Sequence, residues 1–335
     1  MSARVLITGA AGFIGSHLVD LLLEKGCKPQ QLSLLIPRGE SLANLPNLPF
    51  SITRGDVRNS AAVSHAAKGI DTVYHLAAKI DFDGKTYNEY QSINVIGTRT
   101  LLNACKSKKI KKFVSYSTIG VYGLPAAIGP IEGWDETHPK TYTNFYGRSK
   151  WEAELEVVKA HQETGIPYVI IRPASVYGPR EKGPTLALYR AIFRKRFLMV
   201  GDGMNKMHYV YVKDLVSATY LAAKSRRVSG DYIIAGATPT MFKDVVRHVA
   251  ASINATVPNI AIPTWLALGL GYGAEAAGGV FGFKPPIFPS RVKTMTTPYY
   301  YKIDKAKREL KYNPSISFER GATLTGQWYL ENKYL

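Results

Sequence analysis

Residues 144–152 contain a tyrosine and a lysine four positions apart, Tyr146 and Lys150. In a helix these two positions lie on one face, and Asn144 is placed to cap that helix. A free tyrosine titrates at about pH 10, and a nearby ammonium group favours its ionised form. Such a pair can therefore move a proton near neutral pH. The same spacing occurs five times in the chain, so spacing alone does not select this pair.

The other four pairs lie in contexts that do not suit this chemistry. One falls in an alternating pattern typical of a strand, where four residues span about 13 Å. One lies on a predicted helix with no hydroxyl-bearing strand end beside it, and two come after the predicted nucleotide-binding units. These pairs are Tyr209/Lys213, Tyr220/Lys224, Tyr301/Lys305 and Tyr329/Lys333.

Three glycines separate a predicted strand from a predicted helix near the N-terminus, in "VLITGAAGFIGSHLVDLLL". Gly9 suits a tight turn, Gly12 lets a pyrophosphate approach the backbone, and Gly15 lets helix and strand pack closely. The N-terminus of the helix would offer free N–H groups to the phosphates. The order of strand, glycine turn and helix predicts a dinucleotide-binding site.

The ends of the following predicted strands indicate which dinucleotide binds. An acidic residue after the second strand would favour NAD, but Pro37 and Arg38 stand there. An arginine can hold the 2′-phosphate of NADP, so we expect NADP(H), with NAD(H) as the alternative. Asp56 follows the next strand, where a carboxylate can accept a hydrogen bond from the adenine amino group. The small residues of "HLAA" (75–78) leave room for a dinucleotide that lies flat.

The remaining pattern predicts the elements that position these residues. Strand and helix signals alternate through the first half, which indicates an α/β fold with a doubly wound parallel sheet. We expect a nucleotide-binding domain at 1–172 and 204–235. After Pro173 glycine and proline become dense, and we expect a smaller interwoven substrate lobe at 173–203 and 236–335.

Composition and charge limit the cellular context and the partners. The 335 residues include two cysteines and no cluster of cysteine and histidine at metal-ligand spacing, so we expect no metal site and a reducing, cytoplasmic setting. The net charge of +18 includes basic runs at 106–112, 194–196 and 224–227. These runs are solvated helix ends, or they attract an anionic membrane surface, nucleic acid or an acidic substrate. No nucleic-acid fold signature accompanies them.

The ordered motifs resemble those of the extended short-chain dehydrogenases/reductases. The glycine turn, "GDV", "HLAA", "INVIGT", "SYSTIGVYG" and "YGRSK" occur in that family's order and cover essentially the whole chain. The resemblance implies a triad of Thr118, Tyr146 and Lys150, because Thr118 lies three residues before the valine of "VYG". Ser117 carries the neighbouring hydroxyl. Successive side chains of a strand point to opposite faces, so only one of the two hydroxyls can face the active site. The resemblance also implies a homodimer through the helix that bears Tyr146 and the helix over "NVIGTRTLLNACK".

The residues that the resemblance assigns to binding follow the same motifs. Cofactor contacts are implied at Gly9, Ala11, Gly12, Phe13, Ile14, Gly15, Arg38, Asp56, Val57, Leu76, Ala77, Ala78, Asn94, Tyr146, Lys150, Pro173 and Val176, and substrate contacts at Thr118, Tyr177 and Met207.

The substrate is expected to be hydrophobic. Sugar-nucleotide enzymes of this family usually have an arginine where this chain has Met207, whereas "GDGMN" and "KPPIFPSRVKTM" resemble the 3β-hydroxysteroid and sterol-4-carboxylate dehydrogenase branch. A sterol-like or long-chain molecule needs an apolar wall, and a diphosphate needs fixed donors. We therefore expect a dehydrogenase/reductase acting on a sterol-like or long-chain 3-oxo or 3-hydroxy substrate. A sugar-nucleotide epimerase or dehydratase and a non-catalytic NADP-binding sensor or scaffold are the alternatives.

The apolar segment 260–283 has two interpretations. It holds Pro263, Glu275 and six glycines, which makes it a poor single membrane span. We expect it to form part of the lobe or to lie on a membrane surface. The apolar side chains that could line a substrate pocket are Trp265, Leu266, Leu268, Tyr272, Phe281 and Phe283, and those that could contact an acid group are Arg180, Lys182 and Arg291.

Overall fold

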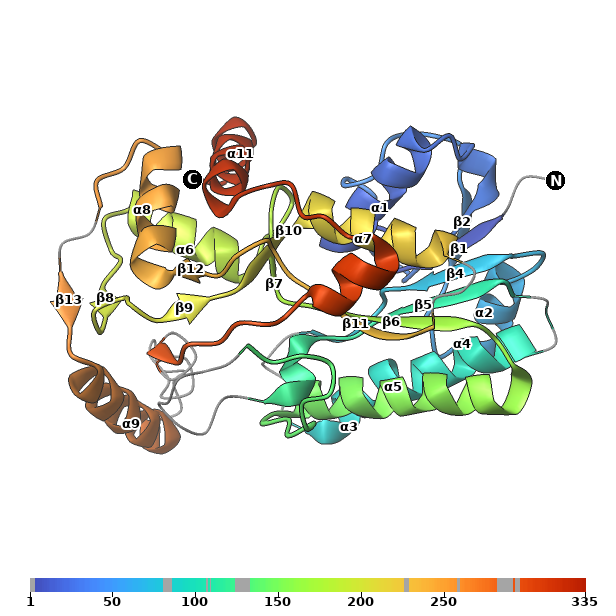
Figure 1. Ribbon diagram of the computed structural model, residues 1–335, viewed down its shortest axis with the longest axis horizontal. Coiled ribbons are helices and arrows are strands. Elements are labelled where there is room, and N and C mark those ends of the chain that lie inside the picture. The colour runs from blue at the N-terminus through green and yellow to red at the C-terminus, as the bar shows by residue number, and fades with distance from the viewer. Residues whose placement is uncertain are drawn as a thin grey trace.

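The computed structural model describes residues 4–80, 86–106, 108, 110–123, 133–225, 229–257, 260–281, 292 and 296–335. For residues 276–281 only the helical backbone is described. Two regions are seen in Figure 1, a sheet domain and a smaller lobe.

A seven-stranded parallel sheet forms the centre of the larger domain, in the order β11-β6-β5-β4-β1-β2-β3. Six of these strands are mostly buried, as strands covered on both faces must be, whereas the edge strand β3 is mostly exposed. The predicted doubly wound parallel sheet is therefore confirmed. The strands are β1 (Val5–Thr8), β2 (Leu32–Ile36), β3 (Ser51–Arg54), β4 (Thr72–His75), β5 (Lys112–Tyr116), β6 (Tyr168–Pro173) and β11 (Gly230–Ile234).

Helices cover both faces of the sheet. Helices α1 (Phe13–Glu24) and α7 (Val212–Lys224) pack together on one face, and α2 (Ser60–Ala66), α4 (Gly97–Lys106) and α5 (Phe145–Thr164) pack on the other (Figure 1). Ion pairs from Arg99 to Glu156 and from Lys106 to Glu163 join α4 to α5. Short α3 (Tyr87–Tyr90) continues into a π-helical stretch, Gln91–Ile96, which leads into α4.

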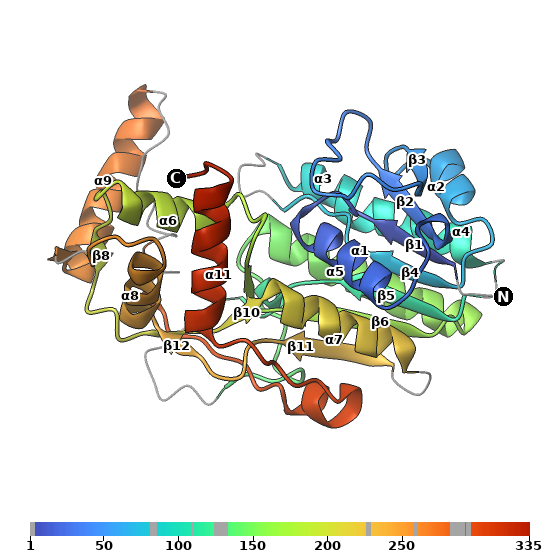
Figure 2. The ribbon, with the colours of Figure 1, turned by 90° about the horizontal axis from the view of Figure 1, so that it is seen from above.

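The lobe is built around three helices, α6 (Pro184–Phe193), α8 (Phe242–Ser252) and α11 (Phe318–Glu331). The Tyr189 hydroxyl of α6 donates to the Ala322 carbonyl of α11, and the Tyr329 hydroxyl of α11 donates to the Glu181 carbonyl, both at 2.7 Å. Helix α9 (Thr264–Phe281) lies at the outer end of the lobe in both ribbon views (Figure 2).

Short strand pairs connect the lobe to the sheet domain. They are β7 (Ser175–Tyr177) with β10 (Tyr209–Tyr211), β9 (Lys206–Met207) with β12 (Thr240–Met241), and β8 (Met199–Val200) with β13 (Ala261–Ile262). A second π-helical stretch, Ala306–Leu310, lies beside β11. Two single 3₁₀ turns, Pro29–Gln31 and Ile119–Tyr122, complete the described elements.

One local prediction is wrong. Tyr209 lies on β10 as expected, but the strand ends at Tyr211 and Lys213 lies in the first turn of α7. Asp214 in that turn explains the early helix start, because a carboxylate is favoured at a helix N-terminus. Among the described residues, no helix is both long enough and apolar enough to cross a bilayer.

Candidate active site

Most of the predicted site residues lie at the carboxyl edge of the parallel sheet. Arg38 follows β2, Asp56 follows β3, Leu76 follows β4, Thr118 follows β5 and Pro173 ends β6. In an open α/β sheet this edge is where ligands bind. The topology therefore gathers on one edge residues that are far apart in the sequence.

Helix α5 places the tyrosine and the lysine beside a threonine at the end of β5. The Asn144 side chain accepts a hydrogen bond from the Gly147 N–H at 2.7 Å, so the predicted cap forms. Tyr146 lies in the first turn of α5, and Lys150 lies one turn later. The Thr118 hydroxyl forms a hydrogen bond with the Tyr146 phenol. The structure therefore brings together the three residues of the predicted triad.

Burial opposes charge on both groups of the pair. It raises the pKa of Tyr146 to about 12, against the effect of the hydrogen bond to Thr118. It lowers the pKa of Lys150 to about 8, against the effect of the Glu154 carboxylate one turn further along α5. Lys150 is 3% exposed, and its ammonium group shows no hydrogen bond within the described parts of the chain. The free protein thus holds a lysine charge that is poorly stabilised.

The two neighbouring hydroxyls at the end of β5 differ in their surroundings. The Thr118 hydroxyl accepts a hydrogen bond from the Gly120 N–H at 3.0 Å and lies against Tyr146. Ser117 is buried, and its hydroxyl has no hydrogen-bond partner among the residues described. Of the two, Thr118 is therefore the one that contacts the tyrosine.

The glycine turn between β1 and α1 leaves space that side chains would fill. Gly9 has φ +72°, and a Cβ atom on it would lie 2.9 Å from the Ala77 nitrogen. A Cβ on Gly15 would lie 2.1 Å from the Gly9 carbonyl oxygen. Gly12 is the N-cap of α1 and supplies no capping side chain, so the N–H groups of the first turn are available to a phosphate. These residues fit a dinucleotide.

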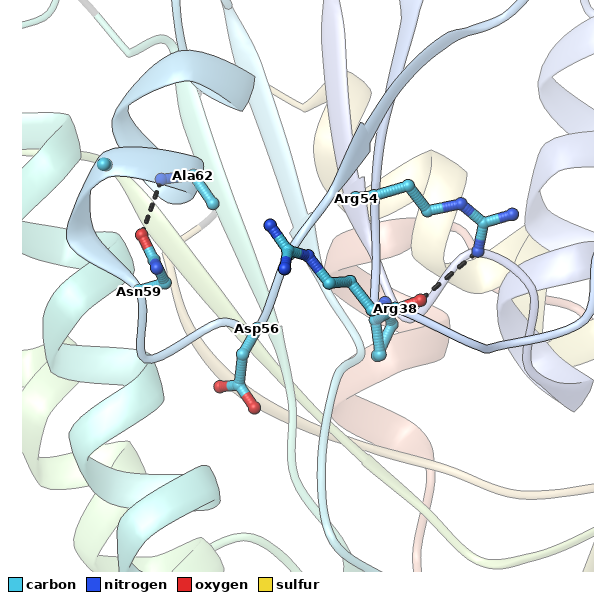
Figure 3. A pocket seen from close by; sticks show the side chains of 8 residues that line it. Arg38, Arg54, Asp56, Asn59 and Ala62 are labelled. Carbon is cyan, nitrogen blue, oxygen red and sulfur yellow. Dashed lines mark hydrogen bonds between the residues drawn. The ribbon is translucent and has the colours of Figure 1, made fainter.

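A cavity of about 610 Å³ lies where the adenosine end of a dinucleotide would bind, between the ends of β2 and β3. In Figure 3 the Arg38 side chain extends toward Asp56 and Asn59, whereas Arg54 turns away toward backbone carbonyls. Arg54 donates to the Glu40 carbonyl at 2.8 Å and to the Pro37 carbonyl at 3.3 Å. Arg38 is exposed and shows no hydrogen bond or ion pair within the described ranges, so its guanidinium can meet an anion.

Asp56 already has a partner in this cavity. Its carboxylate accepts hydrogen bonds from the Arg58 guanidinium at 2.8 Å, and these bonds hold the pKa of Asp56 below its usual value. Arg58 also reaches the Ser92 hydroxyl at 3.3 Å. The predicted contact between Asp56 and adenine stays a prediction. Sequence reasoning missed Arg54 and Arg58, although both stand at or just after the end of β3.

A buried histidine joins the strand ends and was also missed. His75 Nε2 lies 2.9 Å from the Thr98 hydroxyl, which itself donates to the Asn94 carbonyl at 2.6 Å. Nε2 is therefore the protonated nitrogen, and Nδ1 accepts from the Thr8 hydroxyl at 2.7 Å. Burial, with the charge of Lys150 adding to it, lowers the pKa of His75 to about 3. The histidine is neutral in one tautomer and links β1, β4 and α4.

Asn94 continues this network toward α5. Its amide oxygen accepts from the Lys79 N–H at 2.8 Å, and its amide nitrogen donates to the Lys79 carbonyl and to the Ser149 hydroxyl. Ser149 precedes Lys150 and donates to the Tyr146 carbonyl at 2.8 Å. Asn94 therefore ties the segment after β4 to the helix that bears the pair.

The predicted substrate residues lie in the core of the junction between sheet domain and lobe. Tyr177 is 3% exposed, packs against Phe318, and its hydroxyl lies 3.4 Å from the Phe318 carbonyl. Met207 is also buried. Their roles stay predictions, as do those of Val57 and Val176.

The apolar residues expected to line the lobe pocket differ in exposure, and Leu268 is partly buried. Trp265, Leu266 and Tyr272 are exposed, so they form neither core nor an enclosed wall. Arg180, considered as an anion contact, pairs with Asp20 at 2.7 Å. The Phe281 side chain, Phe283 and Arg291 lie outside the described residues.

Comparison with known proteins identifies related sequences. The model of the NAD dependent epimerase/dehydratase family matches residues 5–235. A 2-alkyl-3-oxoalkanoate reductase from Stenotrophomonas maltophilia is 29% identical over 95% of this chain and 97% of its own length. A sterol-4-alpha-carboxylate 3-dehydrogenase from Candida albicans is 30% identical over 98% of each chain. An N-acetyl-alpha-D-glucosaminyl-diphospho-ditrans,octacis-undecaprenol 4-epimerase from Escherichia coli is 31% identical over 88% of this chain and 85% of its own.

Solved structures share the whole architecture. Gox2253 superposes with a TM-score of 0.83 at 24% identity, and the match covers 100% of both chains. A UDP-glucuronic acid 4-epimerase from Bacillus cereus, in complex with NAD, superposes with a TM-score of 0.77 at 26% identity over 99% of this chain and 100% of the other.

Proposed function

The chain belongs to the NAD dependent epimerase/dehydratase family, and from this premise we propose that it interconverts a secondary alcohol and a ketone on a hydrophobic 3-oxo or 3-hydroxy substrate with NADP(H). It is an oxidoreductase of the short-chain type that uses a nicotinamide cofactor.

The contact between Thr118 and Tyr146, one helical turn before Lys150, is the observation that carries the proposal. When bound, the nicotinamide supplies or accepts the hydride. In ketone reduction Tyr146 gives its proton to the substrate oxygen, and in alcohol oxidation its phenolate takes that proton. The ammonium of Lys150 stabilises the phenolate. Thr118 donates a hydrogen bond that holds the reacting oxygen. Ketone, reduced cofactor and one proton thus give alcohol and oxidised cofactor.

Replacement of the tyrosine tests these roles. Tyr146→Phe removes the proton donor but keeps the ring, so turnover should fall by about 10²- to 10⁴-fold. NADPH binding, followed by fluorescence titration, should remain. A variant such as Tyr220→Phe, on helix α7 of the sheet domain, should keep full turnover. Full activity in Tyr146→Phe would remove the basis of the assignment.

The preference for NADP(H) rests on Arg38. Its exposed guanidinium lines the cavity at the end of β2, where the 2′-phosphate of NADP would lie. A hydrogen bond to a charged group contributes about 1.5–3 kcal/mol, which is about 10- to 150-fold in affinity. Arg38→Ser should therefore weaken NADPH by about this factor and leave NADH nearly unchanged, whereas Arg247→Ser, an exposed arginine of α8, should change neither. Tighter binding of NADH than NADPH by the unaltered protein would overturn the preference.

The substrate class is supported by the relatives and by one position. Relatives named as a 2-alkyl-3-oxoalkanoate reductase and as a sterol-4-alpha-carboxylate 3-dehydrogenase both match nearly the whole chain. Met207 stands where the resemblance to sugar-nucleotide enzymes would require an arginine. We expect NADPH oxidation with 2-alkyl-3-oxoalkanoates or 3-oxosteroids in a panel that also contains UDP-sugars.

A sugar-nucleotide epimerase is the second candidate, because one of the matching relatives is named as a 4-epimerase. The same panel separates the candidates. Turnover of UDP-sugars with tightly retained NAD would support the epimerase. No turnover of any panel member, with NADPH bound, would support a sensor or scaffold instead.

A further inference from the structure

The outer face of helix α9 is apolar where it meets water. Trp265, Leu270 and Tyr272 are 73%, 53% and 54% exposed. Trp265 and Tyr272 are seven residues apart, about two turns, so they lie in one line along the helix. Within the first twelve residues of the helix the only charged side chain is Glu275. A surface helix normally turns its polar side chains to solvent, and this helix exposes large apolar ones instead.

The inner face of α9 holds the helix to the lobe through small residues. Ala267 is fully buried against Val200 in a satellite cluster, with Leu268 and Ile262 at its border. Val200 belongs to β8, which pairs with β13 just before α9 begins. The small Ala267 side chain is thus used for attachment, and large apolar side chains are left outside. Helix α9 itself lies at the far end of the lobe (Figures 1 and 2).

The apolar surface continues over the adjacent strand pair and has a basic border. Leu198 and Ile260, which precede β8 and β13, are 45% and 63% exposed. Arg194, Lys195 and Arg196 come directly before this strand region and are exposed. A second copy of the chain would oppose this surface with the same net charge of +18, whereas an anionic lipid surface would oppose it with negative charge.

We propose that helix α9 lies flat on the surface of an anionic lipid bilayer. Trp265, Leu270 and Tyr272 enter the boundary between headgroups and acyl chains, where tryptophan and tyrosine are favoured. The basic run at 194–196 contacts the anionic headgroups. This binding goes beyond the proposed reaction and can be measured without turnover, so the failure of one does not imply the failure of the other.

Sedimentation with lipid vesicles tests the proposal on the full chain. We expect the protein to sediment with vesicles of phosphatidylcholine that contain about one third phosphatidylglycerol, and to bind pure phosphatidylcholine at least about tenfold more weakly. Added salt should weaken the binding to anionic vesicles. The double variant Trp265→Ser/Leu270→Ser should lower partition into anionic vesicles by about tenfold or more, because apolar surface no longer leaves water. Leu48→Ser, at an exposed leucine of the sheet domain, is the matched control and should change nothing.

A second measurement keeps the proposal falsifiable if the double variant fails to fold, as judged by circular dichroism. Lipids brominated in the acyl chain should quench part of the tryptophan fluorescence of the unaltered protein, and Trp265→Phe should lose that quenching. Absence of binding to anionic vesicles, equal binding by a folded double variant, or no quenching attributable to Trp265 would each overturn the proposal. Self-association without lipid that the double variant abolishes would assign the face to a second copy and would also overturn it.

Discussion

Replacing Lys150 by methionine should stabilise the nucleotide-free protein while abolishing turnover. Lys150 is 3% exposed, and burial lowers its pKa from the usual 10.5 to about 8. One pKa unit corresponds to about 1.4 kcal/mol, so keeping the proton at pH 7 costs about 3 kcal/mol. Methionine has a similar length and no charge, and it removes this cost. Glu154 keeps its hydrogen bond to Arg172, so the replacement leaves no unpaired carboxylate.

The stability gained by replacing Lys150 with methionine should depend on pH. The folded protein holds the Lys150 proton less tightly than the unfolded chain, so the cost is fully present below about pH 8 and falls as the pH rises toward 10.5. The gain in the free energy of unfolding should therefore shrink from about 3 kcal/mol at pH 7 to about 1 kcal/mol at pH 10.

Urea unfolding at both pH values measures the gain, and NADPH oxidation measures the loss of activity. The control is Lys159→Met, at a lysine of the same helix that is 68% exposed, and it should change stability by no more than about 0.5 kcal/mol. A loss of stability in Lys150→Met at pH 7, or a gain that does not shrink by pH 10, would refute the reasoning.

Three further predictions concern the turn, the buried ion pair and the pH dependence. Gly15→Ala should abolish NADPH binding in a fluorescence titration, because the new Cβ would lie 2.1 Å from a carbonyl oxygen of the phosphate-binding turn; unchanged affinity would contradict this. Arg172→Met should cost about 3–5 kcal/mol of unfolding free energy in urea, because it leaves Glu154 buried without its main partner; a change below about 1 kcal/mol would argue against it. In a pH–rate profile, kcat/KM for ketone reduction should fall above about pH 8 as Lys150 loses its proton, and a flat profile to pH 10 would refute that assignment.

Most strands of the sheet and the glycine turn could be predicted from local patterns, whereas the triad was implied by the family resemblance and its roles stay predictions. The turn at Gly9 and Gly15 and the cap at Asn144 depend on short-range geometry, and the sequence displays that geometry directly. Thr118 and Tyr146 could be paired because each follows a recognisable element, and a parallel sheet brings strand ends to one edge.

The residues that were missed depend on register and on packing. The Arg54 guanidinium reaches the Glu40 carbonyl, which follows β2, only because Arg54 lies opposite Ile36 in the register of β2 and β3. His75 is held in one tautomer only because β1 and α4 each place a hydroxyl beside one of its ring nitrogens. The prediction that a strand runs through Lys213 is wrong for a related reason. Alternation of apolar and polar side chains does not show where hydrogen bonding between two strands ends.

The position of α11 has a consequence for how the protein is made. The seven strands of the sheet are complete at Ile234, so the sheet domain can fold while the rest of the chain is still being synthesised. The lobe needs α11, which follows α6 and α8 in the chain, to fill the space beside these two helices. Its core is therefore completed only after α11 has been synthesised, when the sheet domain can already hold a nucleotide. Cofactor binding during synthesis would then stabilise the first domain before the second one closes.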